Sequence, residues 1–372
     1  MKTKGFEKCI CLLFCAFLGG IALLFLLLPR RDFSENEKRY LADAPALTWE
    51  NVFSGRFGRE AESYAADHLP GRDFFVGLNA WYDLTSGRQT SKEIYRGKSG
   101  RLYEAPAAMD RAQIARNIEA VNEFARTVGQ PVDLMLVPSA GAVLPEDMPL
   151  LADPYPDREI LSAAATMAEG PVRVFDLLPL FEGAADRGAL FYRTDHHWTS
   201  RGAQLACAAY LEQKGRESLR AEDYDVAACE GFAGTAYSRS ALWGTPPESI
   251  ELWDSGGSFT VENLDAPGTH AGLFYPEHLQ RGDKYPVYLD GNHSLVRIRN
   301  PQGQGKLLVI RDSFANCMGC FLADAYGELV LVDLRYYRAA VSPLLEEEHF
   351  DDVLVLYGVN NFMSDANLMR LE

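Results

Sequence analysis

Apolar residues fill one long stretch near the start of the chain and recur in shorter stretches after it. The long stretch, residues 9–28, reads "CICLLFCAFLGGIALLFLLL" and contains twenty residues without a charge. This length matches the hydrocarbon core of a bilayer and predicts a transmembrane helix. The stretch leads straight into Pro29, Arg30 and Arg31, which form a poor cleavage site. We therefore expect a signal-anchor that stays in place rather than a cleaved signal peptide.

Basic residues lie on both sides of this segment, so the positive-inside rule does not orient it. No later stretch is suited to return the chain across the bilayer. We therefore expect residues 1–8 to be a cytoplasmic tail and the globular part to lie outside the cytoplasm, anchored to the cell membrane by a single pass.

After a polar, helix-prone lead-in region, predicted over residues 29–105, short apolar runs alternate with segments at helical spacing. Short continuous runs separated by helices indicate an α/β fold with a mostly parallel sheet. The predicted strands cover residues 132–137, 172–175, 307–310, 329–332 and 353–356, and the predicted helices cover residues 110–128, 200–213, 343–349 and a run from residue 315. Residues 231–300 are rich in glycine, proline and aromatic residues and predict an insertion with irregular or antiparallel structure.

The composition narrows the class of protein. The chain has 372 residues, of which 47% are hydrophobic, so it can bury a core for one large domain or two modest ones. Its formal net charge is -16, with 52 acidic and 36 basic residues, and the basic residues are scattered. A nucleic-acid binder would show a basic face, so we expect no nucleic-acid partner. The acidic balance also disfavours docking on anionic lipids, so membrane attachment should be hydrophobic.

Three of the seven cysteines lie in the apolar segment, and Cys207, Cys229, Cys317 and Cys320 lie beyond it. Outside the cytoplasm these four could form disulfides, although a domain of this size does not need them. Cys317 and Cys320 have the spacing of a redox motif but lack the surrounding thioredoxin-like pattern. Both fall on a segment that is typical of a packed helix, so we interpret them as buried core thiols.

The segment "LLVIRDSFAN" predicts a strand, a sharp turn and a helix, with Ser313 at the turn. Functional groups of parallel α/β sheets collect beyond the carboxyl ends of the strands. Backbone N–H groups at the start of the following helix could hold an oxyanion beside this serine, so Ser313 is a candidate nucleophile. The alternative is that Ser313 serves only as the helix N-cap, which is a common role for serine.

The segment "FYRTDHHWTSRG" contains Asp195, His196 and His197 in succession. A serine nucleophile needs a base, and the base needs an acid to orient it. Asp195 and His197 are two residues apart and would project to the same side of an extended loop. The carboxylate could then hold one imidazole nitrogen while the other faces a serine. His196 would point the opposite way, and Trp198 would form a wall of the site.

Two other interpretations of this segment remain open. A metal site would need further ligands at short spacing, such as H-x-H or H-E-x-x-H, and the sequence contains none, so we expect no metal. A purely structural role would have the motif tie down a buried loop.

Further candidates for oxyanion or substrate contacts follow predicted strands and loops. An amide donor could come from "LDGNH", a sugar-binding groove from "LRYYR", and polar groups at the same sheet edge from "VNN". Each could instead satisfy loop backbone groups or pack on the surface. The residues are Gly291, Asn292, Arg335, Tyr336, Tyr337, Asn360 and Asn361.

Several blocks in order along the chain resemble the DHHW protein family, whose members look like the SGNH-hydrolase-like domains of alginate O-acetylation proteins. The blocks are "FSENEKRYLADAP", "GKSGRLYE", "TDHHWT", "FAGTAYS", "DKYPVYLDGNH", "LLVIRDSFAN" and "LVDLRYYR". The resemblance implies a three-layer αβα fold with a circularly permuted motif order, formed here by residues 106–372. It also implies that Asp195 orients, His197 acts as base and Ser313 attacks. Arg311 stands where typical SGNH enzymes have glycine.

The resemblance implies a membrane-anchored, extracytoplasmic serine O-acetyltransferase or acetylesterase that acts on an exported polysaccharide or cell-wall glycan. It also implies a membrane-bound O-acyltransferase partner that delivers the acetyl donor. We expect no cofactor. The alternative is a non-catalytic carbohydrate-binding scaffold of a polysaccharide modification and export complex. The separation of Ser313 and His197 in space distinguishes the two.

Overall fold

The computed structural model describes residues 3–371, and contacts divide them into two compact units. The first unit contains the chain up to Ser91 together with Ser238–Gly244, and the second contains Lys92–Tyr237 and the chain from Thr245 onward. The division by contacts comes earlier than the end of the lead-in region predicted over residues 29–105. It also assigns a short part of the predicted insertion to the first unit. The lead-in and catalytic roles of these regions stay predictions.

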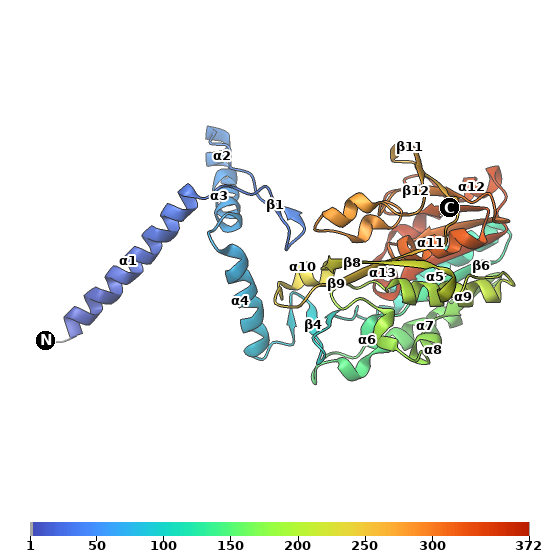
Figure 1. Cartoon of the computed structure of the whole chain (residues 1–372), viewed down its shortest axis with the longest axis horizontal. Helices are drawn as coiled ribbons and strands as arrows, with labels where there is room; N and C mark the ends of the chain where they lie inside the picture. Colours follow the sequence, from blue (N-terminus) through green and yellow to red (C-terminus); the bar gives the residue numbers. More distant parts are fainter. Residues whose placement is uncertain (1–2, 372) are drawn as a thin grey trace. The chain divides into compact units, whose positions relative to one another are not determined.

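The first unit begins with helix α1 (Thr3–Leu27) (Figure 1). Its Gly5–Leu27 stretch has 23 residues and a mean hydropathy of 2.9, and it is the one segment of the described residues that is long and apolar enough to cross a membrane. The helix already includes most of the predicted cytoplasmic tail, whose residues 1–2 lie outside the described residues. The remaining elements up to Ser91 are β1 (Phe33–Ser34), β2 (Arg39–Tyr40), α2 (Trp49–Phe53), α3 (Arg56–Asp67), α4 (Arg72–Thr85) and β3 (Thr90–Ser91).

The second unit is built on an eight-stranded sheet with the order β11-β10-β12-β14-β13-β15-β6-β7. The strands are β6 (Val132–Val137), β7 (Val172–Asp176), β10 (Thr260–Asn263), β11 (Ala266–Ala271), β12 (Leu295–Arg299), β13 (Lys306–Arg311), β14 (Glu328–Val332) and β15 (Asp352–Gly358). The five strands from β14 to β7 pair in parallel, and β12, β10 and β11 add an antiparallel edge. The predicted α/β fold with a mostly parallel sheet is therefore confirmed.

The helices of the second unit pack in two groups, α9 with α11 and α5 with α7, α12 and α13. Their bounds are α5 (Arg111–Val128), α6 (Ala140–Val143), α7 (Asp157–Met167), α8 (Leu178–Glu182), α9 (Ser200–Gln213), α10 (Thr235–Ser240), α11 (Phe314–Ala325), α12 (Ser342–Glu347) and α13 (Val359–Ser364), with α10 running into the first unit. Two antiparallel hairpins complete the unit, β4 (Ile94–Arg96) with β5 (Leu102–Glu104), and β8 (Asp225–Phe232) with β9 (Glu248–Asp254).

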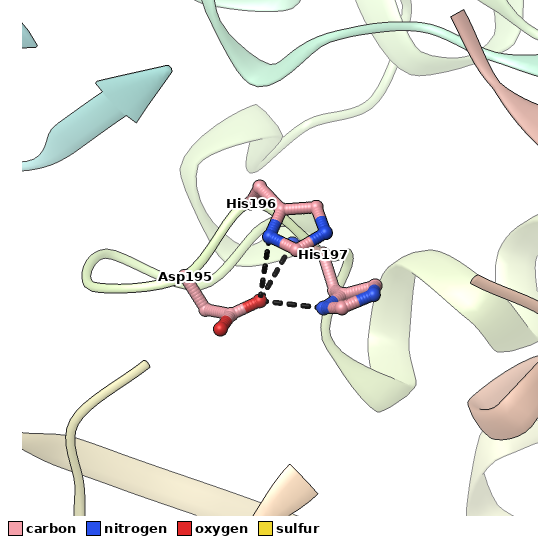
Figure 2. Close-up of side chains that lie close together, drawn as sticks. All are labelled: Asp195, His196 and His197. Carbon is pink, nitrogen blue, oxygen red and sulfur yellow. Dashed lines mark hydrogen bonds and ion pairs between the residues drawn. The ribbon is translucent and has the colours of Figure 1, made fainter. Parts of the chain in front are cut away.

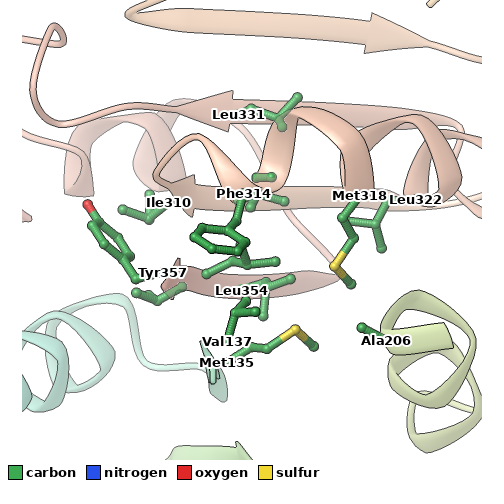
Figure 3. Close-up of a cluster of buried hydrophobic side chains, with 14 of the residues drawn as sticks. Met135, Val137, Ala206, Ile310, Phe314, Met318, Leu322, Leu331, Leu354 and Tyr357 are labelled. Atoms are coloured by element: carbon green, nitrogen blue, oxygen red, sulfur yellow. The ribbon is translucent and has the colours of Figure 1, made fainter. Parts of the chain in front are cut away.

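Strands β6 and β13 are buried over nearly their whole length. This agrees with their continuous apolar sequences, which are typical of central parallel strands. Figure 3 shows side chains of α11 gathered against residues of β6 and β15. Cys317 and Cys320 lie inside this core as free thiols, in agreement with the packed-helix interpretation, and Cys207 is also buried and free.

Because β13, β14, β15 and β6 run in parallel, their carboxyl ends meet at one edge of the sheet. The turn at Ser313, the loop after β14 and the loop that begins with α13 all start from this edge. Chemistry in open α/β sheets is built at that edge. The order of the strands thus brings together segments that are far apart in the sequence.

Candidate active site

Asp195, His197 and Ser313 form a continuous hydrogen-bonded line. The Nδ1 atom of His197 lies 2.6 Å from Oδ1 of Asp195, a contact drawn in Figure 2. The Nε2 atom of the same ring lies 2.7 Å from Oγ of Ser313, across 116 positions of sequence. All three residues are buried or nearly so. The two imidazole nitrogens therefore face an acid on one side and a hydroxyl on the other, the arrangement that activates a serine.

Asp195 is held by a loop that carried no predicted role. Thr235 donates to Oδ2 of Asp195 from its backbone N–H at 2.6 Å and from its hydroxyl at 3.0 Å. Gly234 precedes it, and a Cβ atom at that position would overlap the Asp195 side chain. The backbone N–H of His197 donates to Oδ1 at 2.9 Å. Both carboxylate oxygens are thus committed. In the sequence this loop is marked only by the Gly-Thr pair of the family-like block "FAGTAYS".

His196 does not point away from His197, so that expectation is wrong. The two rings lie 3.8 Å apart between centroids, and Nδ1 of His196 lies 2.6 Å from the Thr235 hydroxyl. The segment is bent rather than extended, because Glu248 accepts the backbone N–H groups of Arg193 and Thr194 and turns the chain there. His196 is therefore a partner of the same loop that positions Asp195.

The electrostatics of the pair favour a neutral base and a charged acid. Burial alone would raise the pKa of Asp195, but the adjacent histidines and the hydrogen bonds from His197 and Thr235 hold that pKa well below its usual range. Burial is the main cause that lowers the pKa of His197 to about 4, and nearby His196 lowers it further, while Asp195 opposes both. At neutral pH the imidazole is therefore unprotonated and can accept the Ser313 proton.

The lowered pKa of His197 should set the pH dependence of acetyl-ester hydrolysis. We expect the rate of acetyl-ester hydrolysis to rise with pH through a midpoint near 4 and to stay level from about pH 6 to neutrality, because the base works only when unprotonated. The measurement is kcat/KM for a chromogenic acetyl ester between pH 3 and 8, corrected for spontaneous hydrolysis. A midpoint near the ordinary histidine value of about 6.5 would contradict the buried environment.

The turn that carries Ser313 is held by its neighbour Asp312 instead of by the serine itself. The Asp312 carboxylate accepts the backbone N–H groups of Phe314 and Gly358 at 2.9 and 2.8 Å and the Asn361 side-chain amide at 2.7 Å. Ser313 occupies the N-cap position of α11 without a side-chain capping bond. Its hydroxyl is therefore free of the capping role that was the alternative interpretation, and it faces His197.

Arg311, which replaces a glycine of typical SGNH enzymes, is fully buried behind the turn. Its guanidinium donates to the Asn316 side-chain oxygen and, at 3.2 Å, to Oδ1 of Asn292, which also accepts from Asn316 at 3.0 Å. Because the Asn292 oxygen takes two donors, its NH₂ group must be directed elsewhere. The arginine thus orients the amide that was predicted as an oxyanion donor.

The loop before Asn292 has a strained backbone. Leu289, Asp290 and Gly291 have φ values of 56°, 62° and 81°, and the first two are not glycine, so each costs about 1–3 kcal/mol. Asp290 is held by His278 at 2.6 Å and by His293 at 3.1 Å. These contacts fix the backbone that presents Asn292 to solvent.

Aromatic packing surrounds the base. The ring of Tyr285 stacks on His197 with centroids 4.0 Å apart and an interplanar angle of 11°. Trp198 has no exposed surface and donates from its indole to the Phe314 carbonyl at 3.1 Å. It therefore supports the first turn of α11. The expectation that Trp198 forms a wall of the site is wrong, because the side chain is fully buried. Tyr285 was not among the predicted residues, since no local motif marks it.

A pocket of about 30 Å³ lies beside the acid side of this arrangement. Its lining includes Asp195, His196, Phe314 and the predicted Asn360, whose side-chain oxygen accepts the Ala107 N–H at 3.2 Å. A larger hollow of about 440 Å³ shares Gly141 and Tyr155 with it.

The three predicted residues of "LRYYR" are placed differently. Arg335 forms a two-pronged ion pair with Asp333 at 2.9 and 2.6 Å. Tyr336 is 49% exposed, and Tyr337 packs against the hydrophobic core. This loop follows β14, which pairs in parallel with β13, so it starts from the same sheet edge as the Ser313 turn. Among residues 3–371, those that line the small pocket do not include any of these three.

Asp195, His196 and His197 are also the one group of three potential metal ligands that lie close together among residues 3–371 (Figure 2). Their donor atoms fall within 4.8 Å of one another. However, all three come from one tripeptide, and their inward atoms are already paired with one another or with Thr235. A hydrogen-bonded acid–base pair accounts for the geometry more fully than a cation site, which would need a ligand from another segment.

Two overlapping segments of the chain match models of known families. Residues 95–238 match the SGNH hydrolase-like domain of the acetyltransferase AlgX, and residues 182–332 match the DHHW protein model. The predicted resemblance to DHHW proteins is confirmed. The chain is 25% identical over 235 residues to a probable alginate O-acetylase AlgJ of Pseudomonas syringae pv. tomato, a match covering 59% of this chain and 57% of that protein.

Solved structures share the fold. A DHHW family protein from Eubacterium siraeum has a TM-score of 0.64 and 20% identity, with 74% of this chain and 93% of that chain covered. Bacillus cereus PatB1 with a sulfonyl adduct has a TM-score of 0.64 and 20% identity, with 75% and 98% covered. The SGNH-like αβα fold predicted from the resemblance is therefore confirmed. The chain spans little more than half the length of the probable alginate O-acetylase.

Proposed function

We propose that this protein is a serine O-acetyltransferase or acetylesterase that acts on a glycan outside the cytoplasm, anchored to the cell membrane by α1. The observation that carries the proposal is the line Asp195–His197–Ser313, with contacts of 2.6 and 2.7 Å between buried groups. The similarity to a protein named as a probable alginate O-acetylase supports an acetyl group as the group transferred.

In the first half-reaction Oγ of Ser313 attacks the carbonyl carbon of an acetyl ester, and its proton passes to Nε2 of His197. The negative charge on the carbonyl oxygen is stabilised by the backbone N–H of Ser313, at the start of α11, and by the Asn292 amide that Arg311 orients. The bond to the donor oxygen then breaks, and His197 returns the proton to that oxygen. Asp195 stabilises the imidazolium that exists between these two proton transfers.

In the second half-reaction a hydroxyl group attacks the acetyl-Ser313 carbonyl, and His197 takes its proton. The bond between the acetyl carbon and Oγ of Ser313 then breaks, and His197 returns the proton to that oxygen. A sugar hydroxyl yields an acetylated glycan, and water yields acetate. The acceptor would bind in the small pocket beside His196 and in the larger hollow that shares Gly141 and Tyr155 with it. Asn360 offers a polar contact in the small pocket, and Lys98 offers one in the larger hollow. A membrane-bound O-acyltransferase would deliver the donor.

The scaffold alternative expected a Ser313 side chain remote from His197. The 2.7 Å contact and the committed oxygens of Asp195 argue against it.

The test of this proposal is covalent trapping. We expect a sulfonyl fluoride to add once to the full-length protein, on Ser313, and to stop hydrolysis of a chromogenic acetyl ester in proportion to labelling. Mass spectrometry of the Ser313 peptide locates the adduct. Addition of an oligosaccharide acceptor then separates the two activities, since transfer gives a sugar heavier by one acetyl group. Full hydrolysis by a protein labelled at Ser313 would overturn the proposal.

A further inference from the structure

The first unit exposes an unusual number of large apolar side chains. Trp49 and Phe53 of α2 are 79% and 83% exposed, and Phe74 and Tyr82 of α4 are 68% and 65% exposed, with Leu78 exposed between them. We call these five residues the aromatic face. Exposed groups of large apolar side chains such as these mark contact with another apolar phase or partner.

The positions of these residues follow the helices. Phe74, Leu78 and Tyr82 recur every four residues and form one stripe along α4. The opposite side of α4 is covered from within the same unit. Ala80 is buried there, and a Cβ atom on Gly77 would lie 3.6 Å from the Ala241 carbonyl. On α2 the rings of Trp49 and Phe53 stack 5.9 Å apart. Each helix thus has an apolar side that this unit leaves open.

The first unit contains a cluster of ion-paired side chains around Asp67. Asp67 is buried and accepts the Arg39 guanidinium at 2.9 and 2.5 Å and the Ala42 backbone N–H at 2.9 Å. Arg72 contacts Glu37 at 2.9 Å in the same cluster. The buried apolar side chains among the described residues of this unit are Leu41, Ala80, Ala241 and Leu242. The unit thus buries few apolar side chains while its large aromatic side chains stay exposed, which is unusual for a soluble domain.

The two units also differ in charge. The first unit contains twelve lysines and arginines and eleven aspartates and glutamates, whereas the second contains 24 and 41. The acidic balance of the chain therefore comes from the second unit. The first unit is nearly neutral and would not be repelled from a lipid surface.

We infer that the aromatic face lies in the lipid bilayer, at the boundary between headgroups and acyl chains. The inference rests on the proposed anchoring by α1, which belongs to the same unit and ends at Leu27, only 22 positions before Trp49. Tryptophan and tyrosine are enriched at this boundary, and amphipathic helices bury an apolar side there. The anchor thus holds the aromatic face close to the one apolar phase that suits it.

Fluorescence quenching by brominated lipids tests the inference on the full-length protein in phosphatidylcholine vesicles. We expect bromines near the top of the acyl chains to remove roughly half of the Trp49 emission, isolated as the difference from a Trp49→Phe variant. A Phe74→Trp variant should add a second emission that is quenched to a similar extent. The matched control is Glu212→Trp, an exposed position on α9 of the second unit, whose added emission should be unaffected.

Two outcomes would overturn the inference, and they differ from failure of the anchor. If neither Trp49 nor Phe74→Trp is quenched while the protein resists carbonate extraction, α1 is anchored but the aromatic face is not in the lipid. Chemical cross-linking of two copies through this face, without quenching, would assign it to a second copy of the chain. If carbonate extracts the protein, the anchoring proposal itself fails, and the inference falls with it.

Discussion

Ser313→Ala and His197→Gln should each lower the kcat of acetyl-ester hydrolysis by about 10⁴-fold or more. Ser313 supplies the attacking oxygen, and His197 is positioned to accept its proton at 2.7 Å. The serine variant should keep its fold, because the hydroxyl makes no capping bond to α11. The measurement is steady-state hydrolysis of a chromogenic acetyl ester, together with the melting temperature of each variant.

The control is Ser162→Ala, which removes an exposed hydroxyl on α7 and should leave the rate unchanged. Combining Ser313→Ala with His197→Gln should cost little more than either change alone, since the two residues act as one unit. Equal rates for the parent protein and both single variants, with melting temperatures unchanged, would contradict the mechanism. Additive losses would show that the two side chains act independently.

Gly234→Ala should reduce kcat by about 10²–10³-fold, although Gly234 touches no substrate. A Cβ atom at this position would overlap the Asp195 side chain, so either the loop or the acid must move. Displacement of Asp195 would loosen its contacts with Thr235 and with Nδ1 of His197. The imidazole would then lose its fixed orientation and the charge that stabilises its protonated form. KM should change less than kcat, because the larger hollow is lined by neither Gly234 nor Asp195.

Gly58→Ala is the matched control for this glycine. It lies in α3 with no atom within 4 Å of the added methyl group, and alanine there should leave the rate unchanged. A pH profile adds a second reading of Gly234→Ala. Because Asp195 opposes the lowered pKa of His197, its displacement should move the acid limb of the profile to lower pH. A Gly234→Ala protein with parental kcat would show that the loop does not position the acid.

The sequence predicted much of the fold because the signals are local. Residues 307–310 and 353–356 form continuous apolar runs, and buried parallel strands require such runs. The antiparallel strands β10 and β11 were not predicted individually, because they are short and lie in a segment rich in turns. The helix predicted over residues 343–349 begins at Ser342 but ends at Glu347.

Two features could be predicted from the sequence alone, because both depend on neighbours along the backbone. They are the two-residue spacing of Asp195 and His197 and the apolar length of residues 9–28. The direction of His196, the burial of Trp198 and the Gly234–Thr235 cradle could not be predicted, because each depends on a contact with a remote segment. The same holds for the lowered pKa of His197, which arises from burial. The sequence by itself determined which chemical groups are present, and the register of the parallel strands decided which of them meet.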